Sequence, residues 1–95
     1  MPDPHVFRPP ADCSLREIRR LKDEIEAALK AAEALTIDCG TVERADLSFV
    51  QLLHAAHRTA RRDAKVLHVA NLSLAARSAF ARAGLPDADR LSATA

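Results

Sequence analysis

An aspartate and a serine two residues apart are the side chains of this sequence that are best placed for chemistry. Asp46 follows a polar stretch and precedes an apolar-periodic segment, so it stands where a helix N-cap is expected. Ser48 then falls in the first helical turn, where free N–H groups and the positive end of the helix dipole favour a phosphate. The pair therefore has two interpretations: a cap followed by a solvent-exposed serine, or a modification site that the cap positions.

Other polar groups have a spacing that favours structural roles. His54 and His57 are three residues apart but lack carboxylate or cysteine neighbours in a zinc-binding pattern, so we expect a solvated pair and no metal. His68, on a predicted strand, is expected to be a surface or hydrogen-bonded residue rather than a catalyst. A basic cluster near the end of the same helix is expected to complement the helix dipole rather than to bind an anion. That cluster consists of Arg58, Arg61, Arg62 and Lys65.

The sequence carries no enzyme signature. Gly40 and Gly84 are its only glycines, so no glycine-rich loop is available to hold a phosphate. Neither Cys13 nor Cys39, nor any serine, lies in a nucleophile motif with a placed base. We therefore expect two reduced thiols, no cofactor and no catalytic residue.

Length and charge limit the class of protein. Ninety-five residues suffice for one domain, and an apolar fraction of 48% is ordinary for a folded chain. Fourteen basic and thirteen acidic residues leave a net charge of +1, which gives no drive towards nucleic acid or an acidic membrane surface. No apolar run approaches the roughly 20 residues of a membrane-spanning helix, and residues 1–10 lack the apolar region of a signal peptide. We expect a cytoplasmic protein without membrane insertion.

The segment around Asp46 is predicted to form a strand, a turn and a helix. Residues 35–39 alternate apolar and polar side chains, which indicates a half-buried strand. From Leu47 the period becomes helical, and residues 65–70 form a second predicted core strand. A strand–helix–strand unit of this length implies parallel pairing through a right-handed crossover. The predicted inward face of its helix consists of Phe49, Val50, Leu52, Leu53, Ala56 and Ala60.

Two further helices are predicted on either side of this unit. Ser14 and Glu17 fit a capping box at the start of a helix that reaches about Ala32 and turns Leu15 inward. Residues 71–73 offer caps for a third helix, which ends at Gly84 with Leu85 folding back on the last turn. Its inward residues are predicted to be Leu74, Ala75, Ala79 and Phe80.

These elements predict one α/β domain over residues 1–95. The alternation within the strands favours a small mixed β-sheet with helices packed mainly on one face. Residues 1–10 are rich in proline and leave room for a short edge strand. Residues 87–95 are predicted to be a flexible polar tail.

Three pieces of the sequence resemble, in their order and spacing, the STAS domain family, to which bacterial anti-sigma-factor antagonists belong. Residues 35–46, LTIDCGTVERAD, are similar to the family's strand and loop ending in an aspartate. Residues 50–53, VQLL, are similar to the start of its switch helix. Residues 69–73 and 83–85 are similar to its later strand, helix and closing AGL. The helix from Ser14 to Leu29 also fits, and the resemblance implies a STAS-like fold that works by binding another protein.

The resemblance also implies a phosphorylation switch, from which this sequence departs. In the family's switches, the residue after the aspartate is a Ser or Thr that a partner kinase phosphorylates, and a Gly usually follows soon after. Here Leu47 occupies the acceptor position, which leaves Ser48 as a shifted phosphorylation candidate. Phe49 replaces the glycine, and it belongs either to the core or to an exposed contact surface.

By resemblance, the partner is an anti-sigma factor with serine-kinase activity or a related signalling kinase. The alternatives are a small STAS subunit of an ABC-type lipid transport system, an adaptor in a chemotaxis-type signalling cluster or, from another class, a minimal enzyme or metal protein. A homodimer is also compatible with the sequence. The expected partner-binding residues are Arg44, Asp46, Leu47, Ser48 and Phe49.

Overall fold

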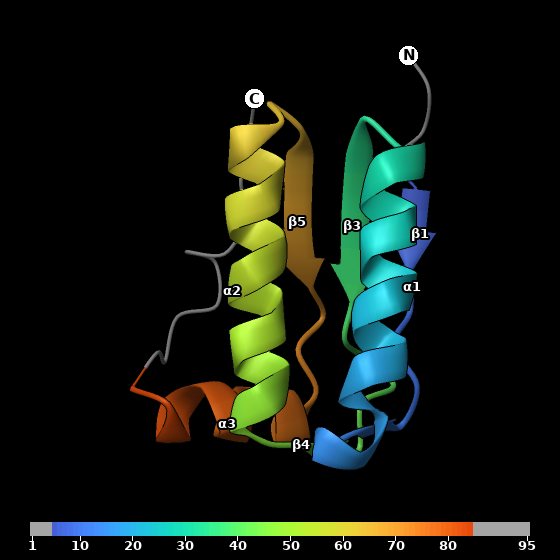
Figure 1. Ribbon diagram of the computed structural model, residues 1–95. Helices are drawn as coiled ribbons and strands as arrows, with labels where there is room; N and C mark the ends of the chain where they lie inside the picture. Colours follow the sequence, from blue (N-terminus) through green and yellow to red (C-terminus); the bar gives the residue numbers. More distant parts are fainter. Residues whose placement is uncertain (1–4, 85–95) are drawn as a thin grey trace.

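The computed structural model describes residues 5–84 (Figure 1). The helices and strands predicted around Asp46 and on either side of it are present, with boundaries that differ by a few residues. Leu85 and the predicted tail of residues 87–95 lie outside the described residues. In chain order, the elements are β1 (His5–Phe7), β2 (Asp12–Cys13), the one-turn 3-10 helix η1 (Leu15–Glu17), α1 (Ile18–Ala31), β3 (Ala34–Asp38), β4 (Arg44–Ala45), α2 (Leu47–Arg62), β5 (Val66–Ala70) and α3 (Leu74–Arg82).

The main sheet has the strand order β1-β3-β5, and both of its strand pairs are parallel. The predicted parallel pairing of residues 35–39 with 65–70 is confirmed, with Leu35 opposite Leu67 and Ile37 opposite Val69. Residues 5–7 form the edge strand for which the N-terminal segment has room. A mixed sheet was expected, but every strand pair among the described residues is parallel, including the small pair β2–β4. The reason is that α1 connects β1 to β3 just as α2 connects β3 to β5, and a helical crossover returns each strand in the same direction.

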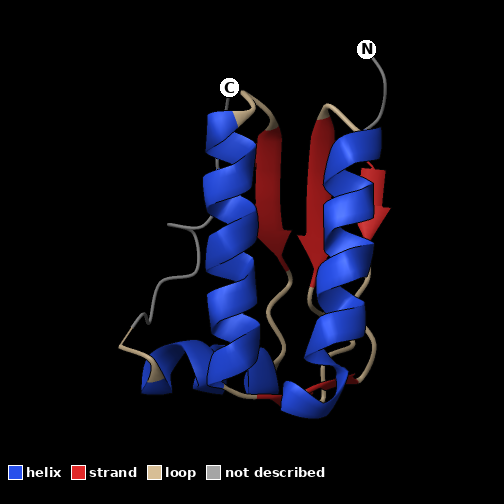
Figure 2. Cartoon of the chain, viewed as in Figure 1, coloured by secondary structure: helices blue, strands red, loops and turns tan. Residues whose placement is uncertain are grey.

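The helices α1 and α2 lie side by side over one face of the sheet, and α3 lies across its end (Figures 1 and 2). This arrangement confirms the expected α/β fold with helices mainly on one face. The strands alternate accordingly: Leu35, Ile37 and Leu67 are buried under the helices, whereas Thr36 is half-exposed and His68 is exposed. Within residues 5–84, no helix combines the length and the apolar character that crossing a bilayer requires.

The core is dominated by the apolar face of α2. All six residues predicted for that face are buried, which confirms the helical phase assigned from the sequence. Phe49 and Phe80 are the largest side chains that are fully enclosed. Burying each large apolar side chain contributes about 1.5–3 kcal/mol, so α2 is held mainly by this face.

Two predicted helix starts differ in the structure. Ser14 makes no side-chain cap, and the chain forms η1 before α1 begins, so the predicted capping box is wrong. In α3 the buried residues are Ala76, Ala79 and Phe80, whereas Leu74 is 81% exposed instead of inward. Leu74 directly follows the cap, and the helical phase set by Phe80 places it outside the contact with α2. The expected end at Gly84 is confirmed, because its φ of +80° suits a residue without a Cβ.

Candidate functional site

The carboxylate of Asp46 binds two helical segments at once. Its Oδ1 accepts a hydrogen bond from the backbone N–H of Ser48 at 3.0 Å and another from the Ser48 hydroxyl. Its Oδ2 accepts from the backbone N–H of Leu15 at 2.9 Å, which ties η1 to the start of α2. These bonds, led by that from the Ser48 hydroxyl, lower the pKa of the Asp46 carboxyl below its ordinary value of 3.8. The predicted N-cap is thus confirmed, and its second oxygen has a tertiary role.

Two leucines expose apolar surface on either side of this carboxylate. Leu47 is 57% exposed and Leu15 is 67% exposed. Each is the first residue of its helical segment, and both segments begin at the same end of the molecule, beyond the carboxyl ends of the sheet strands (Figure 1). Leu15 was predicted to point inward; this is wrong, because the separate turn of η1 takes it out of the helical phase of the buried side of α1. The two leucines give this end an apolar character.

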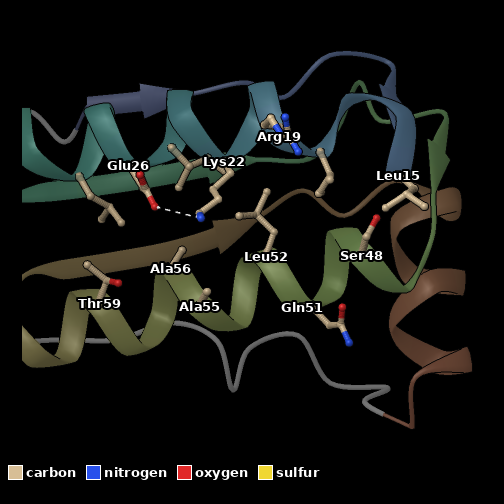
Figure 3. A pocket seen from close by; sticks show the side chains of 13 residues that line it. Leu15, Arg19, Lys22, Glu26, Ser48, Gln51, Leu52, Ala55, Ala56 and Thr59 are labelled. Atoms are coloured by element: carbon tan, nitrogen blue, oxygen red, sulfur yellow. Dashed lines mark ion pairs between the residues drawn. The ribbon is translucent and has the colours of Figure 1, made fainter.

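Ser48 is half-buried between this end and the helical layer. Its hydroxyl donates to Asp46 and also lines a groove between α1 and α2 (Figure 3). A phosphate on Ser48 would remove that donor and place a second negative group beside the Asp46 carboxylate. Like charges at this distance repel, so modification of Ser48 would weaken the cap that positions it.

Arg44 is exposed to solvent, whereas Phe49 is buried. Arg44 is exposed on β4 and shares an open pocket with Leu74 and Arg82. Phe49 is 0% exposed and belongs to the core cluster, so its assignment as a surface contact is wrong and its core alternative is confirmed. The reason is its helical phase, which it shares with Leu53, the central buried residue of α2. The structure therefore brings Arg44, Asp46, Leu47 and Ser48 to one end and removes Phe49 from it.

The polar residues for which we expected structural roles differ in part from that expectation. His54 and His57 are half-buried rather than solvated, whereas His68 is exposed as predicted. Lys65 does not complement the end of α2; its Nζ donates to the carbonyls of Leu29 and Ala32 and so caps the carboxyl end of α1. No sequence pattern indicates this contact, because the lysine and its acceptors lie on different elements.

The two cysteines are free and buried, and their thiols have the character of core groups. Burial raises the pKa of Cys13 to about 12, and the neighbouring Asp12 adds to the shift. Burial likewise raises the pKa of Cys39 to about 12, with smaller contributions from Cys13 and Asp38. A thiol that stays protonated is a poor nucleophile. Among residues 5–84, no group of three His, Cys, Asp or Glu side chains is placed to hold a metal ion.

Sequence reasoning missed the groove between α1 and α2, which Ser48 joins to the exposed end. Seen from close by, Leu52 and Ala56 of α2 face Lys22 and Glu26 of α1 across it (Figure 3). Arg19 and Gln51 also line it. A sequence signal for it was present in α2. Ser48, Gln51, Ala55 and Thr59 are uncharged and recur at helical spacing outside the predicted inward face.

Comparison with known proteins gives one match. A protein-family model described as "Mlab, STAS domain" matches residues 11–91, which is most of the chain and includes every predicted site residue. Neither a curated protein nor a solved structure matches this sequence.

Proposed function

This chain belongs to the STAS domain family, and we propose that it is a cytoplasmic regulatory module that binds a serine-kinase anti-sigma factor or a related signalling kinase. The proposed contact surface, which we name the leucine end, consists of Leu15, Arg44, Leu47 and Ser48. STAS domains in general mediate protein–protein interactions, and the match covers the whole of this surface.

The observation that carries the proposal is the exposure of Leu47 at the start of α2. A leucine that is 57% exposed and whose backbone is held by a capped helix start is a rigid apolar anchor. Fully burying an exposed leucine contributes roughly 1.5–3 kcal/mol, and the part of Leu47 that is still exposed makes somewhat more than half of this available to binding. Arg44, three residues before this anchor, adds an exposed guanidinium, and such a group can pair with a carboxylate of the partner.

The experiment is a paired measurement on Leu47→Asp, with affinity for a serine-kinase anti-sigma factor that binds the wild-type chain and melting temperature determined on the same sample. We expect the affinity to fall by about tenfold or more, because a desolvated carboxylate would replace an apolar contact. We expect the melting temperature to be unchanged, since an acidic residue suits the start of a helix.

Leu74→Asp is the matched control. It makes the same substitution at the first residue of another capped helix, on a leucine that is 81% exposed. Leu74 is not itself a leucine-end residue, but it lines an open pocket with Arg44, so we expect a clearly smaller loss of affinity than in Leu47→Asp. Unchanged affinity in Leu47→Asp would remove Leu47 from the interface, and equal losses in both variants would show that the contact is not specific to α2.

The position of Ser48 in the leucine end supports a version of this proposal in which phosphorylation of Ser48 controls partner binding. We expect a cognate kinase to modify Ser48 or no residue at all, since Leu47 offers no hydroxyl. Mass spectrometry of the treated protein, with Ser48→Ala as control, tests this. Phosphate on any other residue would show that the acceptor position has been assigned wrongly.

A second candidate function is a small subunit that packs permanently beside an ABC-type transport ATPase. Leu47 favours it, because a permanently docked subunit needs an apolar anchor and no phosphate acceptor. Stoichiometric co-purification with the ATPase, unaffected by kinase treatment, would support this candidate over the kinase-binding module.

A further inference from the structure

The groove between α1 and α2 is a second concave surface, separate from the leucine end but joined to it through Ser48 and Leu15. It has a volume of about 450 Å³ and follows η1 and α1 from Leu15 to Leu29, a distance of about 20 Å at the rise of a helix. Apolar side chains from both helices line it, as Figure 3 shows for the α2 side. These apolar residues include Ile18, Ile25, Leu29, Leu52 and Ala56.

The α2 wall of the groove carries no charge. Its residues recur at helical spacing and are small or neutral: Ser48, Gln51, Ala55 and Thr59. The charged residues of α2, Arg58, Arg61 and Arg62, are exposed and do not line the groove. Arg62 lines a separate pocket that adjoins the groove at Thr59 and Glu26. A helix wall without charges, with small residues at Ser48 and Ala55, lets another helix approach closely while the charged residues of α2 stay in water.

The α1 wall carries one positive charge that is not neutralised. Lys22 and Glu26 both line the groove and form an ion pair at 4.0 Å, drawn in Figure 3. Arg19 lines it too, one turn closer to Ser48, and has no carboxylate partner among the described residues. An occupant of complementary charge therefore presents a carboxylate near this end of the groove.

The shape and the charge together decide between occupants. The convex surface of a helix can fill a concave groove. Two copies of this chain that met groove to groove would instead leave a void between them. The exposed side of α3 from a second copy is also unsuitable, because it carries Arg77 and Arg82 and would repel Arg19. The occupant that fits is an acidic amphipathic helix from a different protein.

We propose that the α1–α2 groove receives an amphipathic helix of the partner protein, about four turns long, with its apolar stripe in the groove and a carboxylate against Arg19. The identification of the partner rests on the proposed function, but the chemistry of the occupant rests on the groove. Because Ser48 lines both surfaces, a phosphate on it would add negative charge beside Arg19 and repel the same helix.

The first test is a selection that needs no knowledge of the partner. A displayed library of 18-residue amphipathic helices, with fixed apolar positions and random polar ones, is panned against the full chain and against Arg19→Glu. Binders of the wild type should be enriched in Asp or Glu at one position, and binders of Arg19→Glu in Lys or Arg at that same position. Selections that yield no binders, or the same charge preference from both chains, would overturn the proposal.

The second test uses a matched pair of substitutions. Ala55→Glu puts a charged side chain into the uncharged wall, whereas Ala27→Glu makes the same change at an exposed position of α1 outside the groove. The affinity of a selected helix, measured by titration calorimetry, should fall by about tenfold in Ala55→Glu and stay within about twofold in Ala27→Glu. Equal affinities for the two variants, at equal melting temperatures, would contradict docking in the groove.

Other occupants give different results in the same experiments. If the wild-type chain sediments as a dimer that Ala55→Glu dissociates, a second copy fills the groove and the proposal fails. If Ala55→Glu, but not Ala27→Glu, shifts the NMR resonances of residues 85–95 without any added helix, the chain's own C-terminal segment is the occupant and the proposal fails. Failure of the proposed function appears separately, as unchanged kinase affinity in Leu47→Asp while selected helices still bind the groove.

Discussion

The helical segments that lead into α1 and α2 both begin with a leucine that follows a residue of a capping type, Ser14 or Asp46. Only Asp46 caps its own helix. At α2, the Asp46 side chain caps its own helix through the Ser48 amide. At α1, the Ser14 hydroxyl is buried and has no hydrogen-bond partner among the described residues, and Glu17 makes no cap either. The backbone amide of Leu15 instead donates to Asp46, at the start of the other helix. One helix start is thus built locally and the other is completed from a distance.

This difference shows how the leucine end is held together. A single carboxylate fixes the first turn of α2 and the turn of η1, so the exposed side chains of Leu15 and Leu47 have a common support. A capping box at Ser14 would have satisfied α1 without any contact with α2. The tertiary acceptor therefore replaces the local one and makes the position of η1 depend on Asp46.

The largest expected effect is a difference in stability between a substitution on the buried side of α2 and one in the exposed turn before α1. Leu53→Ala should lower the free energy of unfolding by about 2–5 kcal/mol, through lost apolar transfer and the cavity that remains. Leu53 is 0% exposed, whereas Leu15 is 67% exposed, so Leu15→Ala should cost less than about 0.5 kcal/mol. Urea melts of both variants measure this, and similar losses would mean that η1 packs as tightly as α2.

The next effect concerns the two buried thiols, Cys13 shortly before η1 and Cys39 directly after β3. Their pKa values rise to about 12 in the folded protein from an ordinary 9.0, mainly by burial. Between these two values the unfolded chain loses protons first, so the stability is complete below pH 9 and falls as the pH rises towards 12. Both thiols contribute to this loss, which grows with each pH unit over the interval.

Urea melts between pH 8 and pH 11 measure this loss, and a variant with both Cys13→Ala and Cys39→Ala is the reference. Lysine and arginine side chains are common to both proteins, so the difference in slope isolates the thiols. Identical slopes would contradict a raised pKa for either cysteine.

The features of this fold that could be predicted are those determined by residues close to one another in the sequence. The strands and the inward face of α2 follow from periodicity, and the cap at Asp46 follows from one side chain and the next amide. Leu15, Leu74 and the carbonyls bound by Lys65 depend on partners from other elements, which spacing alone cannot reveal. The candidate site divides in the same way: helical phase already placed Phe49 on the inward face of α2, against the contact role that the resemblance implied, but only packing showed that the α1–α2 groove exists.

A smaller effect tests whether Asp46 serves both helix starts. Asp46→Ala removes the α2 cap, which typically costs about 0.5–2 kcal/mol, and also leaves the Leu15 amide without its acceptor. We therefore expect a loss near the upper end of that range, and faster amide exchange at Leu15 as well as at Ser48. Exchange that changes only at Ser48 would show that η1 does not depend on Asp46.

Acid titration sharpens the same test. Hydrogen bonds hold the pKa of Asp46 below 3.8 in the folded protein, so its contribution is complete above that value and is lost as the pH falls through the folded pKa. Asp46→Asn keeps an acceptor but no charge. Its stability relative to the wild type should improve as the pH drops from 5 to 2, and a constant difference would mean that the carboxylate is not stabilised by folding.

The smallest expected effect tests the comparison most directly. If Ser14 capped α1, Ser14→Ala would cost about 1 kcal/mol, as Ser and Thr caps usually do. Its hydroxyl is instead buried with no hydrogen-bond partner among residues 5–84, so removing it also removes an unsatisfied polar group, and the stability should be unchanged or slightly higher. Ser73→Ala is the matched control, because the Ser73 hydroxyl accepts from the Ala76 amide at 3.1 Å and caps α3. Chemical denaturation of the two variants should show a loss only for Ser73→Ala. A comparable loss for Ser14→Ala would mean that α1 is capped from its own sequence after all, and Asp46 would then support only one helix start.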